Sequence, residues 1–186
     1  MTLKREPHIY TFEAKDGTDV TIRPADIRDA EQIISAAESI VSTRSFIQKE
    51  ETRSLEEEKA FITDMKLSNN MYSVVEAEGK IVGIARVMRG ELEMKRHCGV
   101  FRTWVTEDAQ GKGIGTKIMA YTLDWGRKEN LHKIWLTVFS NNPIASKLYE
   151  RYGFVYEGTQ KDQLCIKGEF EDEIYMAYFF DQRDRC

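Results

Sequence analysis

The feature that most constrains this chain is a glycine-rich turn between a short apolar strand and an amphipathic helix. Phe101–Val105 is predicted to form the strand, and the helix is predicted to open near Gly113. The turn reads Gln110-Gly111-Lys112-Gly113-Ile114-Gly115, so glycine recurs at alternate positions. Glycine lacks a Cβ atom and adopts dihedrals that other residues resist, which lets the main chain approach a ligand closely. Because the N–H groups at a helix N-terminus lack internal partners, the turn predicts a seat for phosphate or pyrophosphate.

The spacing of the glycines separates this turn from two common nucleotide-binding motifs. It lacks the GxxxxGK[ST] pattern of the P-loop, and its third glycine comes one residue too early for GxGxxG. A tight turn before a helix also occurs without any ligand. The turn alone therefore leaves open whether it binds an anion.

A second pattern lies downstream, between Asn142 and Phe154. Pro143 at a first helical position and Gly153 at the end predict a short helix over Pro143–Tyr152. Its apolar and aromatic residues recur at three- and four-residue steps, as in any packed helix. The full pattern is N-x-x-A-x-x-L-Y-x-x-x-G-F, with Tyr149 as its tyrosine.

Together the two patterns resemble, in order and in the elements that join them, the two signatures of the GCN5-related N-acetyltransferase (GNAT) superfamily. The first signature is Q/R-x-x-G-x-G/A, and the resemblance covers about His97–Gly158. It implies that acetyl-CoA is the cosubstrate, with its pyrophosphate on the turn and its pantetheine arm between Phe101–Val105 and Lys133–Phe139, which splay apart. Glu107 departs from the family, since many members carry proline there, but it lies outside the turn.

The resemblance also implies a set of residues that bind the cofactor. Main-chain groups of Trp104 and Val105 would pair with the pantetheine arm, and Asn142 would contact it. The residues of the phosphate turn would be Gln110, Gly111, Lys112, Gly113, Ile114, Gly115 and Thr116.

The rest of the chain predicts a single domain over residues 1–186 with alternating strands and helices. Hairpins, helices and strands follow from turn signals and apolar periodicity. In chain order these are strands His8–Phe12 and Val20–Arg23, helix Asp26–Val41, a helix from Ser54 to about Leu67, strands Tyr72–Ala77, Ile81–Met88 and His97–Val105, a helix to about Lys128, strand Lys133–Phe139, helix Pro143–Tyr152, and closing strands in Phe154–Glu157 and Leu164–Phe180. The continuous apolar run Lys133–Phe139 suggests a strand covered on both faces. The resemblance implies an α/β (α+β) fold of three layers, in which a mixed, mostly antiparallel twisted sheet carries helices on both faces.

Composition narrows the function further. The net charge of −4 does not favour a nucleic-acid surface. Three cysteines, Cys98, Cys165 and Cys186, fit neither a disulfide framework nor a zinc site, so we expect no metal and a reducing compartment. No stretch is apolar and long enough for a membrane span, and the N-terminus lacks a signal-peptide core, so we expect a cytoplasmic protein. Many members of the family are dimers, and no sequence feature decides between a monomer and a homodimer.

Catalysis of amine acetylation requires one group to take a proton and another to stabilise the leaving thiolate. A lysine-type amine has a pKa near 10.4, so only about one molecule in 10³ is uncharged at pH 7. By the resemblance, Tyr149 would reach the sulfur and donate a hydrogen bond to it. His97 has a suitable ordinary pKa for the base and begins the cleft strand, while Glu91, Glu93 and Glu107 are alternatives. Cys98 lacks an evident histidine partner, so direct attack in a ternary complex fits better than a ping-pong route.

The sequence does not identify the acceptor. A small amine, such as a polyamine or an amino acid derivative, and a protein N-terminus both fit. Val155–Met176 loosely resembles the branch with spermidine and ribosomal-protein N-terminal acetyltransferases. Two other function classes stay open: a non-catalytic acyl-CoA sensor on the same fold, and a nucleotide- or phosphate-binding module. Acceptor-site candidates are Phe46, Glu50, Tyr72, Glu91 and Glu93, with the irregular stretch Thr43–Arg53 as a substrate-side or surface loop.

Overall fold

A computed structural model describes residues 7–41 and 51–180 of the chain. Across these residues the strands form one open sheet in the order β1-β2-β3-β4-β5-β6-β8-β7. The strands are β1 (Tyr10–Glu13), β2 (Asp19–Pro24), β3 (Met71–Ala77), β4 (Lys80–Arg89), β5 (Cys98–Val105), β6 (Lys133–Phe139), β7 (Val155–Ile166) and β8 (Glu169–Phe179). The helices are α1 (Ala30–Val41), α2 (Leu55–Leu67), α3 (Ile114–Lys128) and α4 (Pro143–Arg151), with short 3-10 turns η1 (Ile27–Asp29), η2 (Glu93–Lys95) and η3 (Glu107–Ala109). The chain divides into two compact units, Met1–Arg86 with Thr103–Tyr121, and Val87–Arg102 with Thr122–Cys186.

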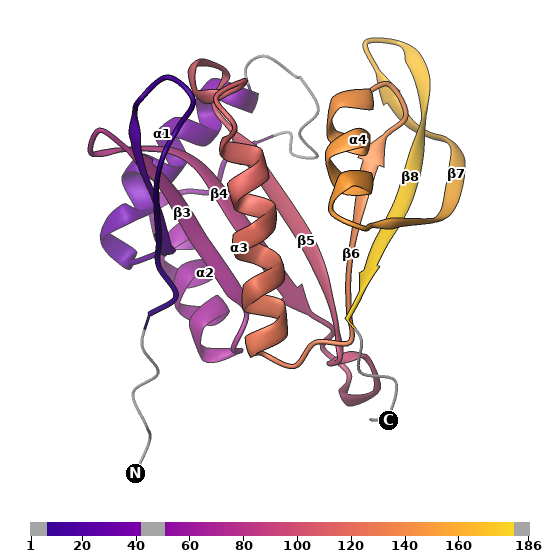
Figure 1. Cartoon of the computed structure of the whole chain (residues 1–186), viewed down its shortest axis with the longest axis horizontal. Helices are drawn as coiled ribbons and strands as arrows, with labels where there is room; N and C mark the ends of the chain where they lie inside the picture. The colour runs from indigo at the N-terminus through magenta and orange to yellow at the C-terminus, as the bar shows by residue number, and fades with distance from the viewer. Residues whose placement is uncertain (1–6, 42–50, 181–186) are drawn as a thin grey trace. The chain divides into compact units, whose positions relative to one another are not determined.

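In the first unit, helices cover both faces of the sheet. Tyr72 and Ser73 are successive residues of β3, so their side chains point to opposite faces. The Tyr72 hydroxyl donates to Glu58 of α2, whereas the Ser73 hydroxyl lies 2.8 Å from the Tyr121 hydroxyl of α3. Figure 1 shows the same arrangement, with α3 in front of the strands and α2 behind them.

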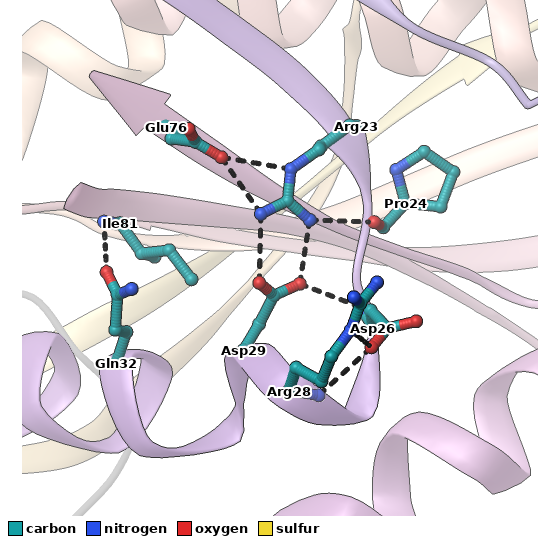
Figure 2. Close-up of polar contacts among 8 residues, drawn as sticks. All are labelled: Arg23, Pro24, Asp26, Arg28, Asp29, Gln32, Glu76 and Ile81. Carbon is teal, nitrogen blue, oxygen red and sulfur yellow. Dashed lines mark hydrogen bonds and ion pairs between the residues drawn. The ribbon is translucent and has the colours of Figure 1, made fainter. Parts of the chain in front are cut away.

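An arginine network ties β2 to β3 and to the start of the first helix. Arg23 of β2 donates two hydrogen bonds to Asp29, at 2.8 and 2.9 Å, and two to Glu76 of β3, at 3.0 and 2.9 Å (Figure 2). Asp29 also accepts from the N–H of Asp26, which caps the turn η1. The helix predicted over Asp26–Val41 is therefore a 3-10 turn capped by Asp26, followed by α1, because the capping box and Arg23 hold Asp29 in place.

In the second unit, β6 pairs in parallel with β5 and antiparallel with β8. The parallel pairing joins Cys98–Val100 to Lys133–Trp135, while β6 continues to Phe139 along β8. The prediction that Lys133–Phe139 is covered on both faces is wrong in part. Ile134, Leu136 and Val138 are buried, whereas Lys133, Trp135 and Thr137 on the other face are only half-buried.

Most other elements begin and end within two residues of their predicted bounds, and the last hairpin differs most. A capping box at Ser54 opens α2, and the Asn142 side chain caps α4. The last hairpin differs because β7 runs without a break from Val155 to Ile166, with register shifts between Tyr156 and Gly158 and between Gln160 and Leu164. The predicted strand over His97–Val105 begins one residue later, at Cys98. The single-domain organisation of the whole chain stays a prediction.

Candidate functional site

The glycine turn belongs to the first unit and has an open main chain. Gly111 and Gly113 adopt φ angles of +75° and +84°, a region that favours glycine, and α3 begins directly afterwards at Ile114. A Cβ atom on Gly111 would meet no atom within 4 Å. Within the described residues, the N–H groups of Gly111, Lys112 and Gly113 donate no backbone hydrogen bond. Unpaired donors at the positive end of a 15-residue helix suit a phosphate or pyrophosphate.

The strand before the turn is fixed by close contacts in the same unit. Gly83 of β4 lies so close to β5 that a Cβ atom there would be 2.7 Å from the Trp104 carbonyl oxygen. The Gln110 side chain donates from Nε2 to the Val105 carbonyl at 3.0 Å. Gln110, predicted to bind the cofactor, thus holds the connection between strand and turn through its amide nitrogen. Trp104 and Val105 are half-buried.

The predicted pantetheine contact Asn142 and the predicted catalytic Tyr149 belong to the second unit. Asn142 Oδ1 accepts from the N–H of Ala145 at 3.2 Å, so this oxygen caps α4. The cap uses the acceptor of the amide and leaves the Nδ2 donor for another partner.

Tyr149 packs with its ring 5.8 Å from that of Phe154, and its hydroxyl makes no hydrogen bond within the described residues. Burial raises the pKa of Tyr149 to about 12, and the charge of Arg102 partly opposes this shift. The phenol is therefore fully protonated at neutral pH and able to donate a hydrogen bond.

Two charged residues that the sequence analysis did not select lie in the same unit. Glu173 of β8 is buried, and it has an electrostatic interaction with Arg102 of β5. Burial lowers the pKa of Arg102, and the nearby Glu173 carboxylate opposes that shift. Glu173 and Tyr175 share one face of β8, where Tyr175 stacks on Trp135 with ring centroids 6.0 Å apart. The sequence pattern that could have identified them is Glu173-x-Tyr175, because alternate residues of a strand lie on the same face.

His97 lies just before β5, five residues before Arg102. Its exposed side chain has its ring 5.8 Å from that of His132, before the first residue of the strand. The five steps from His97 to Arg102 span about 16 Å in an extended strand. Tyr149 interacts electrostatically with Arg102, and within the described residues it makes no hydrogen bond to His97.

The other residues considered for catalysis are the three glutamates and Cys98. Glu91, Glu93 and Glu107 are exposed. Cys98 is half-buried at the start of β5. Within the described ranges, no group of His, Cys, Asp and Glu side chains could hold a metal ion. No described helix is long and apolar enough to cross a membrane.

Of the candidates for the acceptor site, Tyr72 has a structural role. Tyr72 is buried and donates to Glu58, which also pairs with Arg53 at 2.9 Å. Burial and the Glu58 charge raise the pKa of Tyr72 far above its usual value. Tyr72 therefore fastens α2 to the sheet. Phe46 and Glu50 lie outside the described residues.

Comparison with known proteins assigns the family. A model described as the acetyltransferase (GNAT) family matches residues 36–154. The chain belongs to this family. The GNAT fold is also that of a solved relative, a GNAT superfamily phosphinothricin acetyltransferase from Sinorhizobium meliloti in complex with AcCoA, with a TM-score of 0.80, 18% identity, and coverage of 90% of this chain and 89% of that one.

Two curated relatives resemble this GNAT chain over about half of its length. The spermidine N(1)-acetyltransferase of Escherichia coli (strain K12) is 29% identical over 107 residues, which cover 57% of this chain and 56% of the relative. The L-amino acid N-acetyltransferase AaaT of the same strain is 31% identical over 104 residues, which cover 54% of this chain and 62% of the relative. The matches thus span less than two thirds of each relative.

Proposed function

We propose that the protein is an acetyl-CoA-dependent N-acetyltransferase that acts on a primary amine by direct attack in a ternary complex. The observation that carries the proposal is the glycine turn. Its unpaired N–H groups, the positive φ angles of Gly111 and Gly113, and the helix that follows form a seat for a pyrophosphate. Family membership supports acetyl-CoA over other phosphorylated ligands.

The residues of the turn would hold the cofactor through main-chain groups. The N–H groups of Gly111–Thr116 would donate to the pyrophosphate, with Ile114 and Gly115 in the first turn of α3. The main chain of Trp104 and Val105 and the Nδ2 donor of Asn142 would contact the pantetheine arm. Bound acetyl-CoA would supply an activated acetyl thioester.

Tyr149 would act on the departing sulfur. The acceptor amine must lose a proton, since its neutral form attacks the thioester carbon while the carbon–sulfur bond breaks. The protonated phenol of Tyr149 would donate a hydrogen bond to the sulfur as negative charge develops there. His97 is left out of this step, because it lies five residues before Arg102, the residue of β5 with which Tyr149 interacts.

Glu173 is our proposal for the acceptor side. Its buried carboxylate, which also interacts with Arg102, lies on the face of β8 that carries Tyr175, and an acidic group with an aromatic neighbour suits an ammonium ion. Glu173→Gln should raise KM for the amine while the Kd for acetyl-CoA stays within twofold. Glu169→Gln, at an exposed position of the same strand, serves as the control.

The test is a panel of amines with thiol release as the readout. The panel contains spermidine and free amino acids, because two relatives are named for such acceptors, and a peptide with a free N-terminus, because the sequence leaves a protein N-terminus open as the acceptor. We expect thiol release with at least one of them. Saturable binding of acetyl-CoA without transfer to any amine would instead favour the acyl-CoA sensor, and preference for ATP over acetyl-CoA would favour the nucleotide-binding module.

A further inference from the structure

We propose that the hairpin between β1 and β2 is a charged second wall of the pyrophosphate seat, in which Lys15 binds phosphate and Asp16 neutralises Lys112. The inference rests on the proposed function, since it concerns the same ligand. It assigns the N-terminal hairpin, about a hundred residues before the turn in sequence, to cofactor recognition. The residues involved all belong to the first unit.

The hairpin is attached to the glycine turn by its main chain. The N–H of Lys15 donates to the carbonyl of Lys112 at 3.0 Å. The loop is itself closed by hydrogen bonds from Ala14 to Thr18 at 2.8 Å and from Gly17 to Ala14 at 3.0 Å. These hydrogen bonds hold the main chain of the hairpin loop against the glycine turn.

The Lys15 side chain lies along Gly113. A Cβ atom on Gly113 would be 3.4 Å from Cε, 3.5 Å from Cγ and 3.7 Å from Cδ of Lys15. The ammonium nitrogen is one bond beyond Cε, so it lies within about 5 Å of the same point. The aliphatic stem therefore packs on the glycine that the family signature requires, and the charge is carried beside the unpaired N–H groups.

The second lysine at the turn is already neutralised. The Lys112 ammonium pairs with Asp16 at 2.9 Å, and this hydrogen bond raises the pKa of Lys112, with further contributions from Asp108 and Glu78. Lys15, by contrast, forms no ion pair within the described part of the chain. The cation available to an incoming phosphate is thus Lys15, although Lys112 is the lysine inside the motif.

The two hairpin charges act on a bound pyrophosphate with opposite signs. A unit charge about 5 Å from a phosphate changes the binding free energy by roughly 1 kcal/mol in a water-like dielectric, a factor of about five in Kd. Lys15 should strengthen binding, whereas the Asp16 carboxylate repels the anion and holds Lys112 away from it. Removing the two charges should therefore change the affinity in opposite directions.

The experiment is calorimetric titration of acetyl-CoA into the wild type and four variants. Lys15→Met keeps the stem without the charge and should raise Kd about three- to tenfold, and Lys15→Arg should restore most of the affinity. Asp16→Asn should lower Kd about two- to fivefold, because it frees Lys112. Lys66→Ala, at an exposed position in the last turn of α2, should leave Kd unchanged. The rise in Kd caused by Lys15→Met should be smaller in 0.5 M salt, where the Debye length is about 4 Å and the lysine charge is largely screened.

Three other results would overturn the inference. Wild-type binding with Kd unchanged in both Lys15→Met and Asp16→Asn overturns the inference and leaves the proposed function intact. Equal weakening by both variants would mean that the hairpin only supports the turn structurally, which also overturns it. No binding by the folded wild type would overturn the proposed function together with the inference.

Discussion

Replacing Tyr149 by phenylalanine removes one oxygen and tests the chemistry assigned to α4. The pKa of Tyr149 is raised to about 12 by burial. A thiol has a pKa near 8.5, so complete proton transfer to the leaving thiolate is uphill by about 5 kcal/mol at these values. Tyr149 should therefore act as a hydrogen-bond donor that keeps its proton until the sulfur has left.

A hydrogen bond to a charged group contributes about 1.5–3 kcal/mol. Tyr149→Phe should consequently lower kcat about 10- to 150-fold while the Kd for acetyl-CoA stays within twofold. Thiol release at saturating acetyl-CoA measures kcat, with Tyr156→Phe, an exposed tyrosine on β7, as the matched control. The wild type should show no loss of kcat from tyrosine ionisation up to about pH 10.5. A drop smaller than threefold, or a descending limb below pH 10 that the variant lacks, would refute this reasoning.

Three further variants test other parts of the structure. Asp29→Asn should lower the free energy of unfolding by about 2 kcal/mol at pH 7 in a urea titration, because it leaves Arg23 with a broken bidentate pair. Burial opposes ionisation of Asp29, but hydrogen bonds from Arg23 and Asp26 outweigh it and hold its pKa below the usual value. The wild-type advantage should therefore be complete at neutral pH and be lost progressively as the pH falls below the usual carboxyl pKa of about 3.9. An equal difference between the two proteins at pH 7 and at about pH 2 would contradict this. Gly83→Ala should cost about 1–3 kcal/mol, since its Cβ would meet the Trp104 carbonyl, and an unchanged melting temperature would show that β5 can shift freely. Asn142→Asp keeps the helix cap but loses the Nδ2 donor, so it should weaken acetyl-CoA binding while the free energy of unfolding changes by less than about 0.5 kcal/mol. Asn142→Ala should weaken binding and also lower the free energy of unfolding by about 1 kcal/mol. If Asn142→Asp binds acetyl-CoA as tightly as the wild type, Asn142 is not part of the cofactor site.

Local patterns predicted much of the fold, because their causes lie within a few residues of one another. The Ser54 capping box depends on Glu57, three residues away, and the Asn142 cap on Ala145. The long strand β7 was missed because its register shifts interrupt the alternation that marks a strand, and Asp162 adopts a positive φ angle of 51°. Periodicity identifies regular pairing and is weak where bulges occur.

The residue types of a short motif predicted the local geometry of the turn, whereas contacts between distant segments were missed, and the roles of the site residues stay predictions. The turn at Gly111 and Gly113 has the open geometry that its residue types suggested. His97 was selected for its ordinary pKa, which says nothing of its distance from Tyr149. The Lys15 side chain lies next to Gly113, about a hundred residues away in sequence, and no local sequence pattern predicts this contact.

The most direct test of the account is whether acetyl-CoA binds at the glycine turn. Calorimetry should show saturable binding of one acetyl-CoA per chain in the wild type, and at least a hundredfold weaker binding in Gly113→Glu, which places bulk and negative charge at the seat. Gly168→Glu is the matched control, because Gly168 has a similar φ angle of +86° in the β7–β8 turn with open space around it. Unchanged affinity in the folded Gly113→Glu variant, or no binding of acetyl-CoA by the wild type at millimolar concentration, would contradict the account.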